Sequence, residues 1–138
     1  MLAESPRVTE QFNTFLESGS DQELPKRFTF DTLKFFSGST ELMQGSENTI
    51  DEIVIALKTH PAAVVRLESF TDNIGNPIAN LKLSRARARS VKQILIGRGI
   101  DSARIKSVGR GASHPVASNG TPEGRRLNRR IEMVVLQK

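Results

Sequence analysis

The chain has 138 residues, 37% of them hydrophobic and 25% charged, which suits one domain with a packed core and leaves little room for a second. The absence of cysteine excludes a disulfide scaffold, thiolate metal sites and a cysteine nucleophile. The net charge of +5 is unevenly divided: residues 1–81 carry six basic and twelve acidic groups, whereas residues 82–138 carry fourteen basic and three acidic ones. The basic second part indicates either a solvated basic face or a surface that binds an anionic partner.

The first sixty residues predict a helix, a strand and a second helix. Residues 7–17 place four apolar side chains on one helical stripe, and residues 28–30 alternate like a strand. Residues 46–59 form the clearest helix of the chain. Ser46 is its expected N-cap, and Pro61 ends it because the residue before a proline is disfavoured in helical geometry.

The next segment predicts a strand and a third helix. Residues 64–70 alternate so that one face is apolar, while Arg66 and Glu68 point to the opposite, solvent-exposed face. After a loop rich in glycine and asparagine, Ser84 is expected to cap a helix over residues 84–97.

Two further strands complete the chain. Residues 104–108 and 130–136 alternate like strands, and Thr121-Pro122-Glu123 predicts a helical turn between them. The order strand–helix–strand–helix–strand–strand predicts an α+β fold, in which two main helices pack on one face of a small mixed four-stranded sheet.

The predicted start of the third helix carries an unusual group of arginines. With Ser84 as the cap, Arg85, Arg87 and Arg89 stand at the positive end of the helix dipole, where each cation costs roughly 0.3 to 1 kcal/mol. A bound anion explains that placement. Helical phase turns Arg87 toward the sheet, where Asp72 leaves the preceding strand, so the pair flanks either a ligand cleft or a structural salt bridge.

Two blocks of sequence resemble the OmpA-like peptidoglycan-binding domain. The first block consists of Thr71-Asp72-Asn73-Ile74-Gly75, Asn80, Leu83-Ser84, Arg87-Ala88 and Val91. The second consists of Arg104-Ile105, Gly109-Arg110-Gly111, Pro115-Val116, Asn119, Thr121, Glu123-Gly124-Arg125 and Asn128-Arg129-Arg130-Ile131-Glu132. Identities and spacings agree across both blocks, which makes the resemblance highly specific.

The resemblance implies a βαβαββ fold and non-covalent binding of peptidoglycan through the diaminopimelate of its stem peptide. It assigns Asp72, Arg87 and Asn80 to the ligand site and, more weakly, Asp31 and Thr32 in the loop after the first strand. The sequence departs from the family pattern at positions 69 and 70, where Ser69 replaces a usual glycine and Phe70 a usual polar residue or tyrosine.

The chemistry of diaminopimelate suits such a pair of charges. One of its carbons carries both an ammonium and a carboxylate, so Asp72 is expected to take the ammonium and Arg87 the carboxylate, with help from N–H groups at the helix start. No cofactor and no metal site is expected. His60 and His114 are the sole imidazoles, and each precedes a proline in a predicted turn. Arg129 and Arg130 are expected to be structural, because they enter the last strand.

Two alternatives belong to other classes of protein. A basic nucleic-acid-binding module fits the basic second half. Against it, Asp72 is expected to lie in the middle of the positive patch, and no aromatic–basic run is present. A wall hydrolase needs a pair of acid–base carboxyls, and Asp72, Asp101 and Glu123 have no such partner at a readable spacing. We therefore expect a binding domain without catalytic activity.

The sequence also suggests a setting for this domain. We interpret residues 1–24 as an N-terminal helical extension, which covers the core or belongs to a linker, and residues 25–138 as the binding domain. Neither a signal peptide nor an apolar run of membrane-spanning length is present, so we expect both in a longer parent chain that holds this domain in the periplasm.

Overall fold

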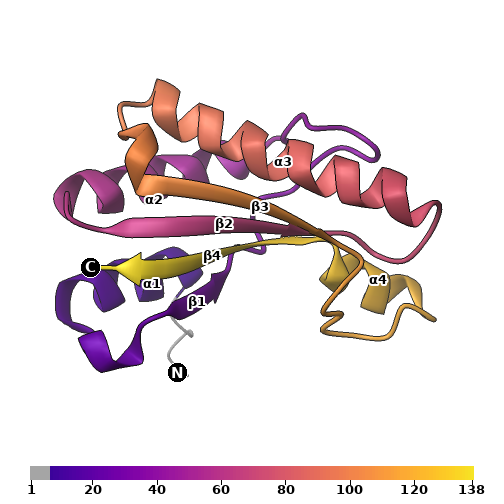
Figure 1. Cartoon of the computed structure of the whole chain (residues 1–138), viewed down its shortest axis with the longest axis horizontal. Helices are drawn as coiled ribbons and strands as arrows, with labels where there is room; N and C mark the ends of the chain where they lie inside the picture. Colours follow the sequence, from indigo (N-terminus) through magenta and orange to yellow (C-terminus); the bar gives the residue numbers. More distant parts are fainter. Residues whose placement is uncertain (1–6) are drawn as a thin grey trace, which may run out of the picture.

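The computed structural model describes residues 7–138 as helices packed on a mixed sheet (Figure 1). The elements in chain order are α1 (Val8–Ser18), η1 (Asp21–Glu23), β1 (Lys26–Thr29), α2 (Ser46–Thr59), β2 (Val64–Phe70), α3 (Pro77–Gly97), η2 (Ser102–Arg104), β3 (Ile105–Gly111), α4 (Pro122–Asn128) and β4 (Arg130–Gln137). The η elements are single 3₁₀ turns. The predicted βαβαββ order is confirmed.

The sheet has the strand order β1-β4-β2-β3. β2 and β3 are parallel and joined through α3, whereas β4 runs antiparallel to both of its neighbours, β1 and β2. Figure 1 shows α3 along one side of the strands, with α1 and β1 at the other. The predicted small mixed four-stranded sheet is therefore confirmed.

One hydrophobic core joins the helices to the sheet. Its strand residues alternate as predicted: Val65, Leu67, Ile131, Met133 and Val135 are all 1% exposed or less. Helices α2 and α3 cover this face through the buried residues Ile53, Leu57, Val91 and Leu95.

Helix α1 packs on this core. The Phe12 ring makes edge contacts with Phe28 and Phe30, at centroid distances of 5.6 and 5.7 Å. Of the two roles foreseen for this helix, covering the core is the one it has. A domain boundary after residue 24 stays a prediction.

The predicted start of the third helix is wrong. The cap lies eight residues earlier than predicted, at Asn76, which accepts hydrogen bonds from the backbone N–H groups of Ile78 and Ala79 at 2.8 and 3.1 Å, and helix α3 begins at Pro77. Asn followed by Pro at the first helical position is itself a start signal. Ser84 lies inside the helix, where its hydroxyl donates to the carbonyl of Leu81 and accepts from the N–H of Gly111.

Two smaller predictions are also wrong. The N-cap of α2 is Gly45, with φ of 96°, and Ser46 is the first helical residue, whose buried hydroxyl accepts from the N–H of Lys34. Glu68 is 2% exposed instead of solvated, because arginines from three strands close over it. Arg27 comes from β1, Arg66 from β2 and Arg110 from β3.

Candidate functional site

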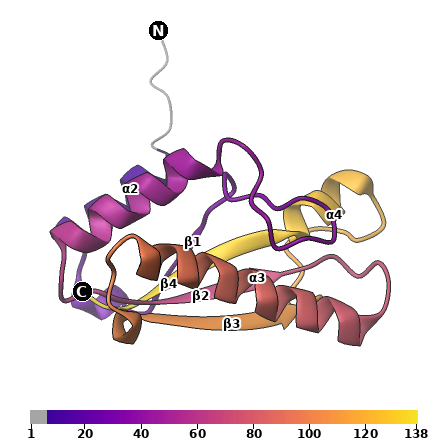
Figure 2. The ribbon, with the colours of Figure 1, turned by 90° about the horizontal axis from the view of Figure 1, so that it is seen from above.

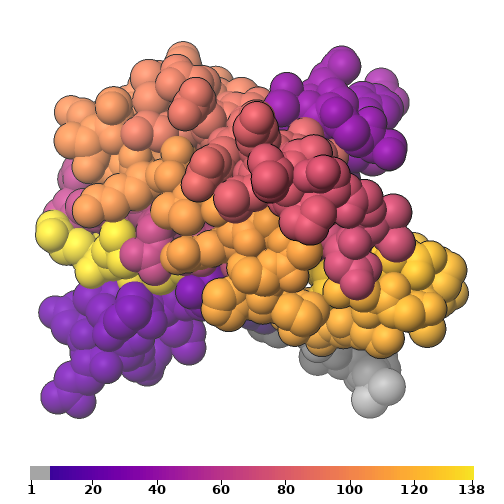
Figure 3. Space-filling view, turned by 45° about the vertical axis from the view of Figure 1, so that its right-hand side comes forward, coloured from indigo at the N-terminus to yellow at the C-terminus, as the bar shows by residue number. Residues whose placement is uncertain are grey.

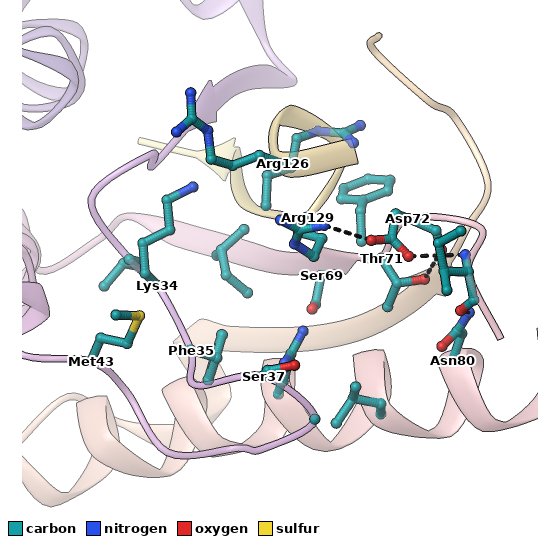
Figure 4. Close-up of a pocket in the computed structure, with 18 residues that line it drawn as sticks. Lys34, Phe35, Ser37, Met43, Ser69, Thr71, Asp72, Asn80, Arg126 and Arg129 are labelled. Atoms are coloured by element: carbon teal, nitrogen blue, oxygen red, sulfur yellow. Dashed lines mark hydrogen bonds and ion pairs between the residues drawn. The ribbon is translucent and has the colours of Figure 1, made fainter. Parts of the chain in front are cut away.

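A cavity of about 700 Å³ opens where the end of β2 meets α3, α4 and the loop between β1 and α2 (Figure 4). Figure 2 shows that loop reaching across toward α4. Figure 3 shows the segment after β3 lying at the surface between α3 and α4. The lining residues are Leu33, Lys34, Phe35, Ser37, Gly38, Met43, Ser69, Phe70, Thr71, Asp72, Ile74, Asn80, Leu83, Arg87, Arg126, Arg129, Arg130 and Ile131.

Asp72 is held in place directly after β2. Its Oδ1 accepts from the N–H of Ile74 at 3.0 Å, and its Oδ2 accepts from Nη1 of Arg129 at 2.6 Å (Figure 4). The hydroxyl of Thr71 donates to the Asp72 carbonyl at 2.8 Å. The carboxylate is thus oriented in advance, while its 14% exposure keeps it within reach of a ligand.

Arg87 lies in the middle of α3 and is 7% exposed. Its Nε donates to the carbonyl of Ser39 at 2.8 Å, its Nη2 donates to the carbonyl of Phe36 at 3.2 Å, and its guanidinium lies 5.0 Å from the centre of the Phe35 ring. Arg87 therefore fastens the loop between β1 and α2 over the cavity.

Within residues 7–138, Arg87 forms no direct ion pair. Burial lowers its pKa, the nearby Arg129 lowers it further, and Asp72 opposes both effects. Among the described residues, Asp72 pairs with Arg129 and not with Arg87, so the structural Asp72–Arg87 salt bridge considered from the sequence is not formed. A guanidinium bonded only to neutral carbonyls remains an attractive partner for an anion.

The dipole argument that pointed to Arg87 is wrong. Because α3 starts at Pro77, Arg85, Arg87 and Arg89 lie in the helix interior, far from its positive end. The free N–H groups expected to help bind the ligand carboxylate are therefore absent from this position. Asp72 and Arg87 nevertheless line the same cavity, as the sequence predicted.

The remaining predicted site residues divide into two groups. Asn80 lines the cavity from the first turn of α3, where its Nδ2 donates to the carbonyl of Ile74 at 2.9 Å and braces the loop that carries Asp72. Asp31 and Thr32 line a second cavity of about 790 Å³ instead, and the Thr32 hydroxyl bonds to the hydroxyl of Thr49. The structure does not bring these two residues to Asp72.

Three basic residues of the cavity were not among the predicted ligand-binding residues. Lys34 comes from the loop after β1, Arg126 from α4, and Arg129 from the turn that joins α4 to β4. Arg129 was expected to be structural, yet it faces the cavity and pairs with an aspartate 57 residues away. Helix and strand periodicity cannot predict a contact between residues so far apart in the chain. The family resemblance, whose second block includes Arg129, was the one feature of the sequence that pointed to this residue.

Arg130 has the structural role expected of it. Its Nε pairs with Glu132 at 2.6 Å, and its guanidinium lies 3.9 Å from the centre of the Phe70 ring. Because Glu132 neutralises Arg130, this residue adds little free charge to the cavity. The positive charge that faces the ligand space comes from the other four basic side chains.

Neither a metal site nor a membrane span is found in the part of the chain that the structure describes. In residues 7–138, no three side chains of His, Asp or Glu are grouped to hold a metal ion. Over the same residues, no helix combines the length and the apolar character needed to cross a bilayer.

Comparison with known proteins identifies relatives of this chain. The family model described as "OmpA family" matches residues 34–129. The probable lipoprotein YiaD of Escherichia coli is 38% identical over 112 residues, which are 81% of this chain and 49% of YiaD. The peptidoglycan-binding protein ArfA of Mycobacterium tuberculosis is 38% identical over 103 residues, 75% of this chain and 32% of ArfA. The chain thus spans about half or less of these relatives.

A solved structure matches nearly the whole chain. The cell wall anchor of the type VI secretion system from Pseudomonas aeruginosa superposes with a TM-score of 0.71 at 28% identity, and the match covers 98% of this chain and 100% of that one. Its fold agrees with the sheet and helices described above.

Proposed function

This chain belongs to the OmpA family, and we propose that it binds peptidoglycan non-covalently through diaminopimelate and thereby anchors a larger envelope protein to the cell wall. The observation that carries the proposal is the meeting of Asp72 and Arg87 on one cavity. Two relatives, the peptidoglycan-binding protein ArfA and the secretion-system cell wall anchor, support peptidoglycan as the ligand by their names.

The cavity offers opposite charges for a zwitterion. Asp72 receives the ammonium of diaminopimelate, and this contact competes with the pair to Arg129. Partly exposed ion pairs contribute about 0 to 1 kcal/mol, so a ligand ammonium displaces or shares that contact at small cost. Arg87 then holds the carboxylate on the same carbon, as expected from the sequence. Arg129 takes the assisting role that was expected of N–H groups at a helix start.

A site of this kind gives modest affinity for a single stem peptide. Hydrogen bonds to charged groups contribute roughly 1.5 to 3 kcal/mol each, and the site offers two or three of them. Anchoring does not require more, since the wall repeats the same epitope many times and the parent protein supplies further attachment.

We further propose that the domain is not an enzyme and that it works in the periplasm. Among the described residues that line the cavity, Asp72 is the sole carboxylate, whereas hydrolysis of the wall needs a second acid or base. A periplasmic location follows from the ligand, and the names of relatives such as the outer-membrane lipoprotein YfiB of Pseudomonas aeruginosa agree with it.

The test is co-sedimentation with purified sacculi. Asp72→Ala and Arg87→Ala are expected to abolish binding, and free diaminopimelate is expected to compete with the wild type where lysine does not. Arg89→Ala and Glu41→Ala are matched controls, because both side chains are exposed and outside the cavity. Retained binding by both site variants would refute the proposed site.

Since Arg87 also fastens a loop, its variant needs a check on folding. Circular dichroism and thermal unfolding provide that check. Asp72→Ala removes no buried contact to that loop, so it separates loss of the ligand from loss of structure.

A further inference from the structure

The cavity holds more positive charge than one zwitterion uses. In the proposed complex Asp72 binds the ammonium, and Arg87 and Arg129 bind the single carboxylate of the zwitterion. Lys34 and Arg126 remain, and both side chains line the same cavity.

Lys34 and Arg126 lie together, apart from the Asp72 end. Figure 4 shows their side chains on the side of the cavity away from Asn80, with Arg129 between them and Asp72. Neither side chain makes a hydrogen bond or ion pair within the described structure. Lys34 is half-buried, and burial followed by the charges of Arg129 and Arg126 lowers its pKa, against an opposing effect of Asp31.

We propose that Lys34 and Arg126 form a second anion subsite, which binds a further carboxylate of a stem peptide whose diaminopimelate lies between Asp72 and Arg87. This inference rests on the proposed function and extends it from one amino acid to a peptide. The anion relieves the repulsion between the two cations, and the guanidinium offers it a bidentate contact.

Two carboxylates of a stem peptide have the chemistry required. One is the α-carboxylate of the glutamate that precedes diaminopimelate, and the other is the C-terminal carboxylate of the alanine that follows it. With either carboxylate, the domain is expected to prefer stem peptides in which that carboxylate is free. Amidation of the carboxylate removes its charge and leaves Lys34 and Arg126 without an anion to bind.

Isothermal titration with four ligands tests the subsite. The ligands are an alanine–glutamate–diaminopimelate–alanine tetrapeptide, the same peptide amidated at the glutamate α-carboxylate, the same peptide amidated at its C-terminus, and free diaminopimelate. The wild type is expected to bind the unmodified peptide about tenfold more tightly than one of the amidated forms, and the weaker form identifies the carboxylate.

Two variants assign that difference to the subsite. Lys34→Gln and Arg126→Gln are expected to lose about tenfold in affinity for the unmodified peptide while binding free diaminopimelate as the wild type does. Arg89→Gln, an exposed arginine of α3 outside the cavity, is the control for a change in overall charge.

The outcomes separate this inference from the proposed function. The subsite is refuted, and the proposed function stands, if neither amidation nor the two substitutions change the affinity for the peptide. The same conclusion follows if the two substitutions weaken the binding of free diaminopimelate as much as the binding of the peptide. If the wild type binds neither the peptides nor diaminopimelate, the proposed function is refuted and the subsite with it.

Discussion

The carboxylate of Glu68 is expected to make folding sensitive to acid. On β2, two residues from the strand end that leads to Asp72, Glu68 is 2% exposed. It accepts from Nε of Arg110 at 2.9 Å and Nε of Arg66 at 3.0 Å, and Nη1 of Arg27 lies 3.3 Å from its Oε1. Burial alone would raise the pKa of Glu68, but the three arginines lower it to about 2.

The difference from the ordinary pKa of 4.5 gives the size of the effect. A pKa lower in the folded state than in the unfolded state contributes stability above the unfolded value, and this stability is lost as the pH falls through the folded value. At about 1.4 kcal/mol for each pH unit, Glu68 contributes about 3 kcal/mol at neutral pH. Most of it is expected to disappear between pH 4.5 and about 2.

Urea unfolding at several pH values, followed by circular dichroism, measures this contribution. Glu68→Gln is expected to lower the free energy of unfolding by about 3 kcal/mol at pH 7 and by far less near pH 2. At pH 7, Arg66 and Arg110 lose their anion, and Arg27 keeps only Glu132. Glu41→Gln, at an exposed carboxylate outside the network, is expected to change neither value. A Glu68→Gln variant that loses as much stability in acid as the wild type would refute the reasoning.

Three further substitutions test the packing around the site. A Cβ at Gly109 would lie 2.3 Å from the backbone nitrogen of Arg85, so Gly109→Ala is expected to lower the free energy of unfolding by more than about 2 kcal/mol. Gly97→Ala is the control, because a Cβ there meets no neighbouring atom within 4 Å outside its own stretch of helix. Equal melting temperatures of the two variants would contradict this prediction. Asn128→Ala is expected to cost about 2 to 3 kcal/mol in urea unfolding, because the 1% exposed amide satisfies two N–H groups of the loop before α4. Arg87→Lys keeps the charge but cannot reproduce both carbonyl contacts, so faster hydrogen exchange in the loop over the cavity and about tenfold weaker ligand binding are expected; unchanged exchange would show that the guanidinium does not fasten this loop.

The amino-acid sequence by itself determined the elements whose pattern is local. The alternation in β2 and β4 identified Val65, Leu67, Ile131, Met133 and Val135 as core residues, and each is buried. The period of α2 and the proline after it gave the bounds of that helix. Such features repeat within a few residues and can be read from composition and spacing alone.

The start of α3 shows where local reading failed. Asn76-Pro77 is a local start signal, but the glycine and asparagine around it favour a loop, and Ser84 before three arginines resembles the start of a helix. Asp72 and Arg87 nevertheless line one cavity, and the family resemblance identified both of them independently of the dipole argument. The helical phase of Arg87, which turns it toward the end of the preceding strand, was read correctly although the start of the helix was not.

The tertiary structure alone decided which charges face one another. The sequence placed Asp72 and Arg87 at one cleft, as a ligand site or a salt bridge, whereas the folded chain pairs Asp72 with Arg129 and sets Lys34 beside Arg126. It also buried Glu68 beneath arginines from three strands. Ion pairs form between side chains that are close in space. The order of the strands in the sheet decides which side chains these are, and the periodicity of the sequence does not predict that order.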